Sequence, residues 1–198
     1  MIRIAEKYIA DVRSGKIAVS TTTRLTFDRH AADLRVAPEN GWYFDKKAAE
    51  RVLDFCGLLK HSPDKRSWVT FNPEPWQAAI IYIIFGWHKK DGSRRFNYAY
   101  IEIAKKNGKT TFAAVLANYL LFFDGEEEAE VYHVATVEKQ AHICFDKAKR
   151  MIEKSPALAK RARCDKSIFG KYGVLRSNGD AMACPRLDAH GRARIPGF

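Results

Sequence analysis

Five consecutive residues in the middle of the chain have the types and the order that bind nucleotide phosphates. They are Asn107-Gly108-Lys109-Thr110-Thr111. In such a loop, backbone N–H groups surround phosphate oxygens at the start of a helix, whose N-terminus carries a partial positive charge. Lys109 is expected to pair with the β- and γ-phosphates, and Thr110 to place its hydroxyl on Mg²⁺. The pattern therefore predicts a site for the cofactors ATP and Mg²⁺.

The loop lacks one residue of the full Walker A pattern, G-x-x-x-x-G-K-[ST]. Ile103 stands where that pattern has its first glycine. A bare G-K-[ST] occurs by chance in about one chain in ten of this length. The flanking residues therefore decide whether this match indicates a phosphate-binding loop. A β-prone run over 98–103 precedes the loop, and apolar residues at helical spacing follow over 112–123. The alternative is an ordinary strand-to-helix turn with solvated lysines.

The order of predicted elements indicates an α/β fold. Helices are expected over 4–15, 25–35, 46–59 and 78–87, and then strand and helix alternate through 98–103, 112–123, 131–135 and 138–154. Such alternation is typical of a parallel sheet. The prediction is an incomplete P-loop NTPase (RecA-like, ASCE) parallel sheet preceded by an α-helical segment. The expected segments are a helical part over 1–65, a partial ATPase core over 66–180 and an irregular tail over 181–198.

Composition narrows the classes of partner. The net charge is +11, and many lysines and arginines lie between Lys147 and Lys171. A basic face of this kind binds polyanions such as DNA through their phosphates. A solvated surface with no binding role is an equally good interpretation of the same residues.

The sequence also bears on the cellular compartment. The apolar run 78–87 is too short to span a membrane, and the N-terminus has no signal-peptide pattern. The four cysteines are scattered, which favours structural thiols over disulfides or zinc. A cytoplasmic protein is expected.

Gln77 is a further candidate, thirty residues before the loop. Its amide has both a donor and an acceptor, so it can pair with N7 and with the N6 amino group of adenine. It also directly follows Trp76 at the start of a predicted helix, where a helix-start role is the more common one. Both roles stay open at this point.

Taken together, these residues resemble the large terminase subunits of tailed bacteriophages, whose ATPase motor packages viral DNA into procapsids. The resemblance runs through most of the chain, and terminases carry a deviant phosphate loop without the first glycine. The matching segments are Tyr8-x-x-Asp11-Val12-x-x-Gly15-Lys16, Asp45-x-x-Ala48-Ala49-Glu50-Arg51-Val52, Pro75-Trp76-Gln77, Ile103 to Thr110, and Val134-Ala135-Thr136 with Gln140-Ala141.

The resemblance implies a role for each matching position. Gln77 is expected to recognise adenine, and the residues of the loop to bind phosphates and Mg²⁺. The family places an arginine or similar basic residue three positions before the loop glycine, where it senses the γ-phosphate. Here that residue is Lys105, which supplies charge without the planar fork of arginine. Double-stranded phage DNA, a small terminase subunit and a portal are the implied partners, in the cytoplasm of a bacterial host.

The chain departs from the family at its C-terminal end. An acidic motif, an apolar run ending in Asp-Glu, would hold Mg²⁺ and activate water, yet no such pair follows the strand-like run 172–175. The nuclease domain expected after the motor does not follow either. The sequence thus predicts the N-terminal part of a terminase, cut short by the choice of expressed segment or by a disrupted prophage gene. It also predicts nucleotide binding with hydrolysis near background.

Two other functions remain open from the sequence. One is a helicase-like P-loop ATPase, because helicases share the upstream glutamine and the loop. The other is a catalytically silent fragment that binds DNA or a protein partner through its basic face.

Overall fold

The computed structural model describes residues 1–64, 66–126 and 129–160, together with the backbone of five short strands after residue 162. These residues form two compact units. The first contains Met1–Cys56 and Asn72–Glu102, and the second contains Gly57–Phe71 and Ile103–Phe198. The segments 1–65, 66–180 and 181–198 expected from the sequence follow chain order, whereas the compact units interleave. That division of the chain therefore stays a prediction.

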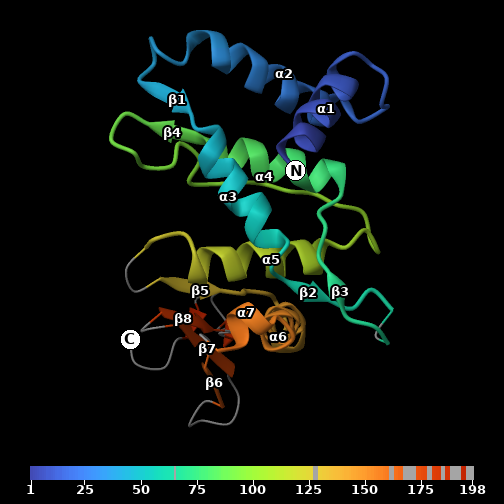
Figure 1. Ribbon diagram of the computed structural model, residues 1–198, viewed down its shortest axis with the longest axis vertical. Helices are drawn as coiled ribbons and strands as arrows, with labels where there is room; N and C mark the ends of the chain where they lie inside the picture. Colours follow the sequence, from blue (N-terminus) through green and yellow to red (C-terminus); the bar gives the residue numbers. More distant parts are fainter. Residues whose placement is uncertain are drawn as a thin grey trace. The chain divides into compact units, whose positions relative to one another are not determined.

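The first unit is built from four helices and one short antiparallel pair of strands (Figure 1). Helix α4 packs against both α1 and α3, and strands β1 and β4 pair with Tyr43 opposite His88. The helices expected over 4–15, 25–35, 46–59 and 78–87 are confirmed, with ends that differ by a few residues. The bounds are α1 Ile2–Arg13, α2 Thr21–Val36, β1 Trp42–Phe44, α3 Lys46–Cys56, α4 Pro75–Gly86 and β4 Trp87–Lys89.

Local sequence explains both ends of α4. At the start, Glu74 and Gln77 form a capping box, in which each side chain accepts a hydrogen bond from the backbone N–H of the other residue. Pro75 follows Glu74 at the first helical position, where its missing N–H costs nothing. At the other end, a Cβ on Gly86 would lie 2.4 Å from the ring of Phe44. Only glycine allows β1 to approach the helix this closely.

Aromatic rings fill the centre of this unit. Trp87 is fully buried, and its indole Nε1 donates a hydrogen bond to His30 Nδ1 at 3.0 Å. The ring centroids of His30 and Phe44 lie 5.0 Å apart, and those of Phe44 and Tyr82 lie 4.8 Å apart. An imidazole nitrogen that accepts a hydrogen bond carries no proton, and a ring with one unprotonated nitrogen is neutral. The cluster therefore holds His30 in its uncharged form.

This burial makes stability depend on pH. Desolvation lowers the pKa of His30 to about 4 from an ordinary 6.5, so below pH 6.5 the unfolded chain takes up a proton that the folded chain excludes. We expect stability to be constant above pH 6.5 and to fall between pH 6.5 and 4 by up to about 3 kcal/mol. Urea unfolding of the wild type and of His30→Gln across this range measures the effect. A slope that persists in His30→Gln would assign it to other groups.

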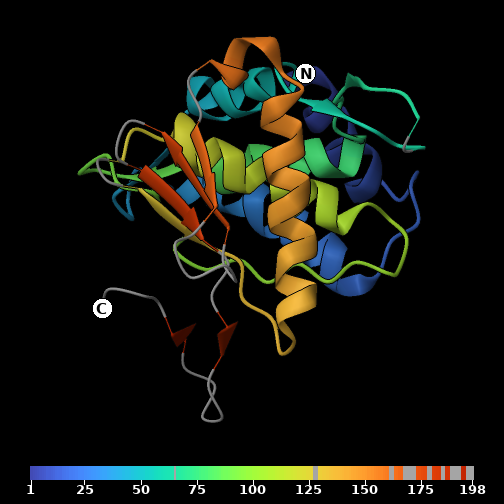
Figure 2. The same cartoon turned by 90° about the horizontal axis from the view of Figure 1, so that it is seen from below.

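The second unit contains α5, α6 and α7 with a short hairpin (Figure 2). Helix α6 packs along α5 through a stripe of buried residues at helical spacing: Ala141, Phe145, Ala148, Met151 and Ile152. Helices over 112–123 and 138–154 and a strand over 131–135 were expected, and all three are confirmed with shifted ends. The bounds are β2 Lys60–His61, β3 Val69–Thr70, α5 Lys109–Phe122, β5 Glu130–Tyr132, α6 Glu138–Glu153 and α7 Pro156–Ala159.

A mixed sheet completes this unit, with strand order β5-β8-β7-β6. Strand β5 runs parallel to β8, with Glu130 opposite Ala181, whereas β8 with β7 and β7 with β6 are antiparallel. A separate antiparallel pair joins β9 and β10. The α/β class is confirmed, although the described sheet is mixed and mostly antiparallel. The bounds are β6 Arg163–Lys166, β7 Gly173–Ser177, β8 Asp180–Ala183, β9 Arg186–Leu187 and β10 Ala193–Arg194.

One predicted strand is wrong as a paired element. Residues 98–103 form no ladder with any strand in the described part of the chain. Tyr98 and Tyr100 are 94% and 89% exposed. β-propensity reflects packing on a pleated surface rather than an intrinsic backbone preference, so a β-prone run without a neighbouring strand stays unpaired.

No helix in the described residues is long and apolar enough to cross a membrane.

Candidate nucleotide site

The predicted phosphate loop leads directly into α5, as the sequence indicated. Gly108 is the N-cap residue and has φ of 73°, a left-handed conformation that glycine adopts without strain. Two residues earlier, Lys106 has φ of 71° and is the one non-glycine residue with positive φ among those described. Non-glycine residues in sparsely populated backbone regions cluster at ligand sites and active sites. The loop thus has the tight bend that a phosphate cradle requires.

The N-terminus of α5 keeps its backbone donors available. Its N-cap residue, Gly108, makes no side-chain capping hydrogen bond. The first helical hydrogen bond runs from Phe112 N–H to Gly108 O, so the N–H groups of Lys109, Thr110 and Thr111 precede it. Such donors, together with the partial positive charge of the helix end, are the groups that bind anions at other helix N-termini.

Helix α6 contacts this first turn of α5 at two consecutive residues. Lys147 Nζ donates a hydrogen bond to Thr111 Oγ1 at 2.8 Å. One turn earlier on α6, the thiol of Cys144 lies 3.7 Å from the carbonyl oxygen of Thr110. The two helices are also linked further along, where the buried Asn118 Nδ2 donates to Ala148 O. Sequence reasoning missed Lys147 and Cys144, because contacts across 34 to 36 residues leave no local pattern.

The exposure of the predicted residues fits a surface site. Lys105, Asn107, Gly108 and Lys109 are exposed, and Thr110 and Thr111 are half-buried. All six lie in the second unit. Lys109 begins the helix, so its side chain starts beside the first N–H groups of α5. The six residues lie within one short segment of the chain, and their roles in binding phosphate and Mg²⁺ stay predictions.

Gln77 lies in the first unit, on the first turn of α4. It is 4% exposed, and its Oε1 accepts a hydrogen bond from Glu74 N at 2.9 Å. The helix-start role that the sequence left open is thus present in the structure. Recognition of adenine by the other atom of the amide, Nε2, stays a prediction.

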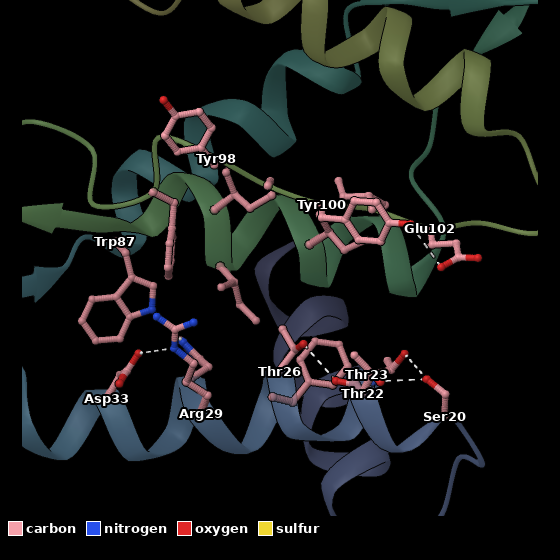
Figure 3. A pocket seen from close by; sticks show the side chains of 18 residues that line it. Ser20, Thr22, Thr23, Thr26, Arg29, Asp33, Trp87, Tyr98, Tyr100 and Glu102 are labelled. Atoms are coloured by element: carbon pink, nitrogen blue, oxygen red, sulfur yellow. Dashed lines mark hydrogen bonds and ion pairs between the residues drawn. The ribbon is translucent and has the colours of Figure 1, made fainter.

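A pocket of about 710 Å³ lies within the first unit, between α2, α4 and the extended segment after β4 (Figure 3). Its lining includes apolar side chains of α4, namely Ile80, Ile83 and Ile84. Polar side chains of α2 line another part, and there Ser20 Oγ and Thr23 Oγ1 lie 2.9 Å apart. No residue predicted for the nucleotide site lines this pocket.

The sequence and fold of this chain are similar to those of known proteins. Residues 75–181 match the sequence model of a family described as terminase large subunit, ATPase domain. Among solved structures, the chain is similar to the large terminase of bacteriophage HK97, with a TM-score of 0.57 and 24% identity over 74% of this chain. The matched part is 28% of that terminase, so the chain spans about a quarter of its length. No curated protein sequence matches the chain.

Proposed function

Because the chain belongs to the terminase large-subunit ATPase family, we propose that its second unit binds ATP·Mg²⁺ as the nucleotide site of a DNA-packaging motor. The observation that supports this most directly is the start of α5. There an uncapped helix N-terminus, a left-handed glycine, a lysine and a threonine hydroxyl occur within three residues.

The chemistry of these groups fits a triphosphate with its metal. The N–H groups of residues 109–111 donate to phosphate oxygens, as they do at other helix N-termini. Asn107 supplies an amide at the rim of the loop, and Lys109 pairs its ammonium with the β- and γ-phosphates. Thr110 is placed to give Mg²⁺ a hydroxyl ligand. Lys105, three residues before Gly108, is the candidate contact to the γ-phosphate.

ATP supplies the phosphoanhydride bond whose hydrolysis drives a motor of this kind. Its hydrolysis also needs a carboxylate that orients water, and no Asp-Glu pair occurs between Tyr172 and Phe198. We therefore expect this chain to bind the nucleotide with turnover near background. The RecA-like parallel sheet expected from the sequence belongs to the same proposal, and the parallel pair β5 with β8 is compatible with it.

Viral DNA is the proposed cargo, with a portal and a small terminase subunit as partners in the cytoplasm of a bacterial host. Support comes from the exposed basic residues Arg150, Lys154 and Lys160 on α6 and just after α7. A protein that binds any polyanion would use the same residues. Measuring DNA affinity against salt concentration, with and without ATP, separates the motor segment from such a binder, because ATP changes DNA affinity only where the nucleotide and DNA sites are coupled.

Thermal unfolding with and without ATP·Mg²⁺ tests the proposed nucleotide site. A ligand that binds the folded state stabilises it by about 2.7 kcal/mol at a concentration of 100 Kd. The midpoint should rise with ATP·Mg²⁺ and rise less with AMP, which lacks the β- and γ-phosphates. An unchanged midpoint at millimolar ATP·Mg²⁺, with no heat of binding in calorimetry, would contradict the proposal.

Gln77→Glu tests adenine recognition separately from helix capping. Glutamate keeps the oxygen that accepts from Glu74 N, so the capping bond survives. A carboxylate cannot donate to N7 of adenine, however. We expect a loss of about tenfold in ATP affinity, equivalent to one charge-assisted or buried hydrogen bond. The carboxylate at this 4% exposed position should also lower the melting midpoint, so affinity is compared at a temperature where both proteins are folded. Calorimetry with ATP and GTP measures it. Equal ATP affinity in the wild type and the variant would leave Gln77 with the capping role alone.

A further inference from the structure

We propose that Lys147 is a positioning residue of the nucleotide site, acting on the phosphate loop from the neighbouring helix α6. This inference rests on the nucleotide site proposed above and adds to it a residue outside the loop. Its basis is the hydrogen bond from Lys147 Nζ to Thr111 Oγ1 at 2.8 Å. Thr111 directly follows the proposed Mg²⁺ residue Thr110, within the first turn of α5.

The position of the ammonium is electrostatically unusual. Cations stabilise the C-terminal end of a helix and are unfavourable at the N-terminal end, where the helix dipole is itself positive. Here Lys147 lies at the N-terminal end of α5, which already carries Lys109. The field of Lys147 extends to β2, because it contributes to the lowered pKa of the half-buried His61, after the larger effect of desolvation. Such a concentration of positive charge is favourable once an anion binds.

The contact also restrains the backbone of the turn. Lys147 anchors the side chain of Thr111, while the Cys144 thiol approaches the carbonyl oxygen of Thr110. These two contacts hold adjacent residues of α5 from one face of α6. The N–H groups of the same turn then point to the loop in a fixed arrangement. Preorganised donors of this kind bind charge without a reorganisation cost.

Two roles for Lys147 differ in the ligand-free protein. A purely structural brace would lower the melting midpoint when it is removed. A lysine that acts on a bound anion instead changes affinity more than it changes the stability of the ligand-free protein. We therefore expect Lys147→Met to leave the ligand-free midpoint nearly unchanged, and to weaken ATP·Mg²⁺ binding about tenfold, as expected for one nearby charge. Methionine keeps the length of the aliphatic chain and removes the charge.

The experiment combines calorimetry with thermal unfolding of the full chain. Lys147→Arg should keep most of the affinity, because it restores the charge and the donor. Thr111→Val removes the acceptor and should weaken binding less than Lys147→Met does, and adding it to Lys147→Met should change little further. Lys149→Met is the matched control: it removes a lysine two positions along α6 that pairs with Glu153 at 3.8 Å, and its affinity should equal that of the wild type.

The outcomes separate this inference from the proposed site itself. If the wild type binds ATP·Mg²⁺ and Lys109→Ala does not, while Lys147→Met binds as the wild type does, the site stands and the role of Lys147 is wrong. A ligand-free midpoint that falls in Lys147→Met in proportion to the lost affinity would also overturn it, in favour of a structural brace. If the wild type itself fails to bind, the proposed site fails first.

Discussion

Lys109→Ala is expected to reduce the affinity for ATP·Mg²⁺ by about 100-fold, which corresponds to about 2.7 kcal/mol. The exposed lysine begins α5 beside three backbone N–H groups that precede the first helical bond. Its ammonium would neutralise the β- and γ-phosphates, and charge-assisted hydrogen bonds are about twice as strong as neutral ones. The folded state should lose little, because an exposed side chain is removed and alanine favours a helix. Calorimetry and thermal unfolding measure the two effects separately.

The control for this variant removes the same charge from an exposed lysine outside the phosphate loop. Lys47 is exposed on α3 in the first unit, and Lys47→Ala should bind ATP·Mg²⁺ as the wild type does. An equal loss in both variants would indicate a general effect of net charge, which falls with increasing salt. Undiminished binding by Lys109→Ala would contradict the assignment of the phosphate loop.

Local sequence was enough to predict the elements that are determined by nearby residues. Gly108 and the spacing of apolar residues after it placed a helix directly behind the loop, and α5 begins at Lys109. The helix expected over 78–87 is also present, although it begins three residues earlier, at Pro75, with Glu74 and Gln77 forming the capping box. In both cases the decisive hydrogen bonds join residues three or four positions apart, so the information lies within one turn of chain.

Long-range pairing was not predictable in the same way. The run 98–103 has strand-forming residues, but a ladder needs a partner, and no strand in the described residues pairs with it. The antiparallel pairing of β1 with β4 joins segments more than forty residues apart, and no turn signal connects them. For the same reason the candidate site was predicted only along the loop. Lys147 reaches the loop because α6 packs on α5. The apolar residues of the two helices indicate that each helix is buried on one side, but not that the two helices pack on each other.

Trp87→Ala is expected to cause the largest loss of stability, about 3 to 5 kcal/mol, as for other large aromatic residues removed from a core. The indole is fully buried, with its ring centroid 5.2 Å from that of Phe44 and 5.8 Å from that of His30. Removing it leaves a cavity between α2, β1 and α4 and also deprives His30 Nδ1 of its donor. Urea unfolding followed by circular dichroism measures the change.

Two further variants divide this loss between packing and hydrogen bonding. Trp87→Phe keeps a ring in the cluster and removes Nε1, so it should cost about 1 to 3 kcal/mol for the buried acceptor left on His30. Trp68→Ala, at a residue that is 39% exposed, should cost less than about 1 kcal/mol. If Trp87→Ala cost no more than Trp68→Ala, the aromatic cluster would not be the core of the first unit. A cost for Trp87→Phe close to that for Trp87→Ala would instead show that the bond to His30, rather than the volume of the ring, holds α2 against α4.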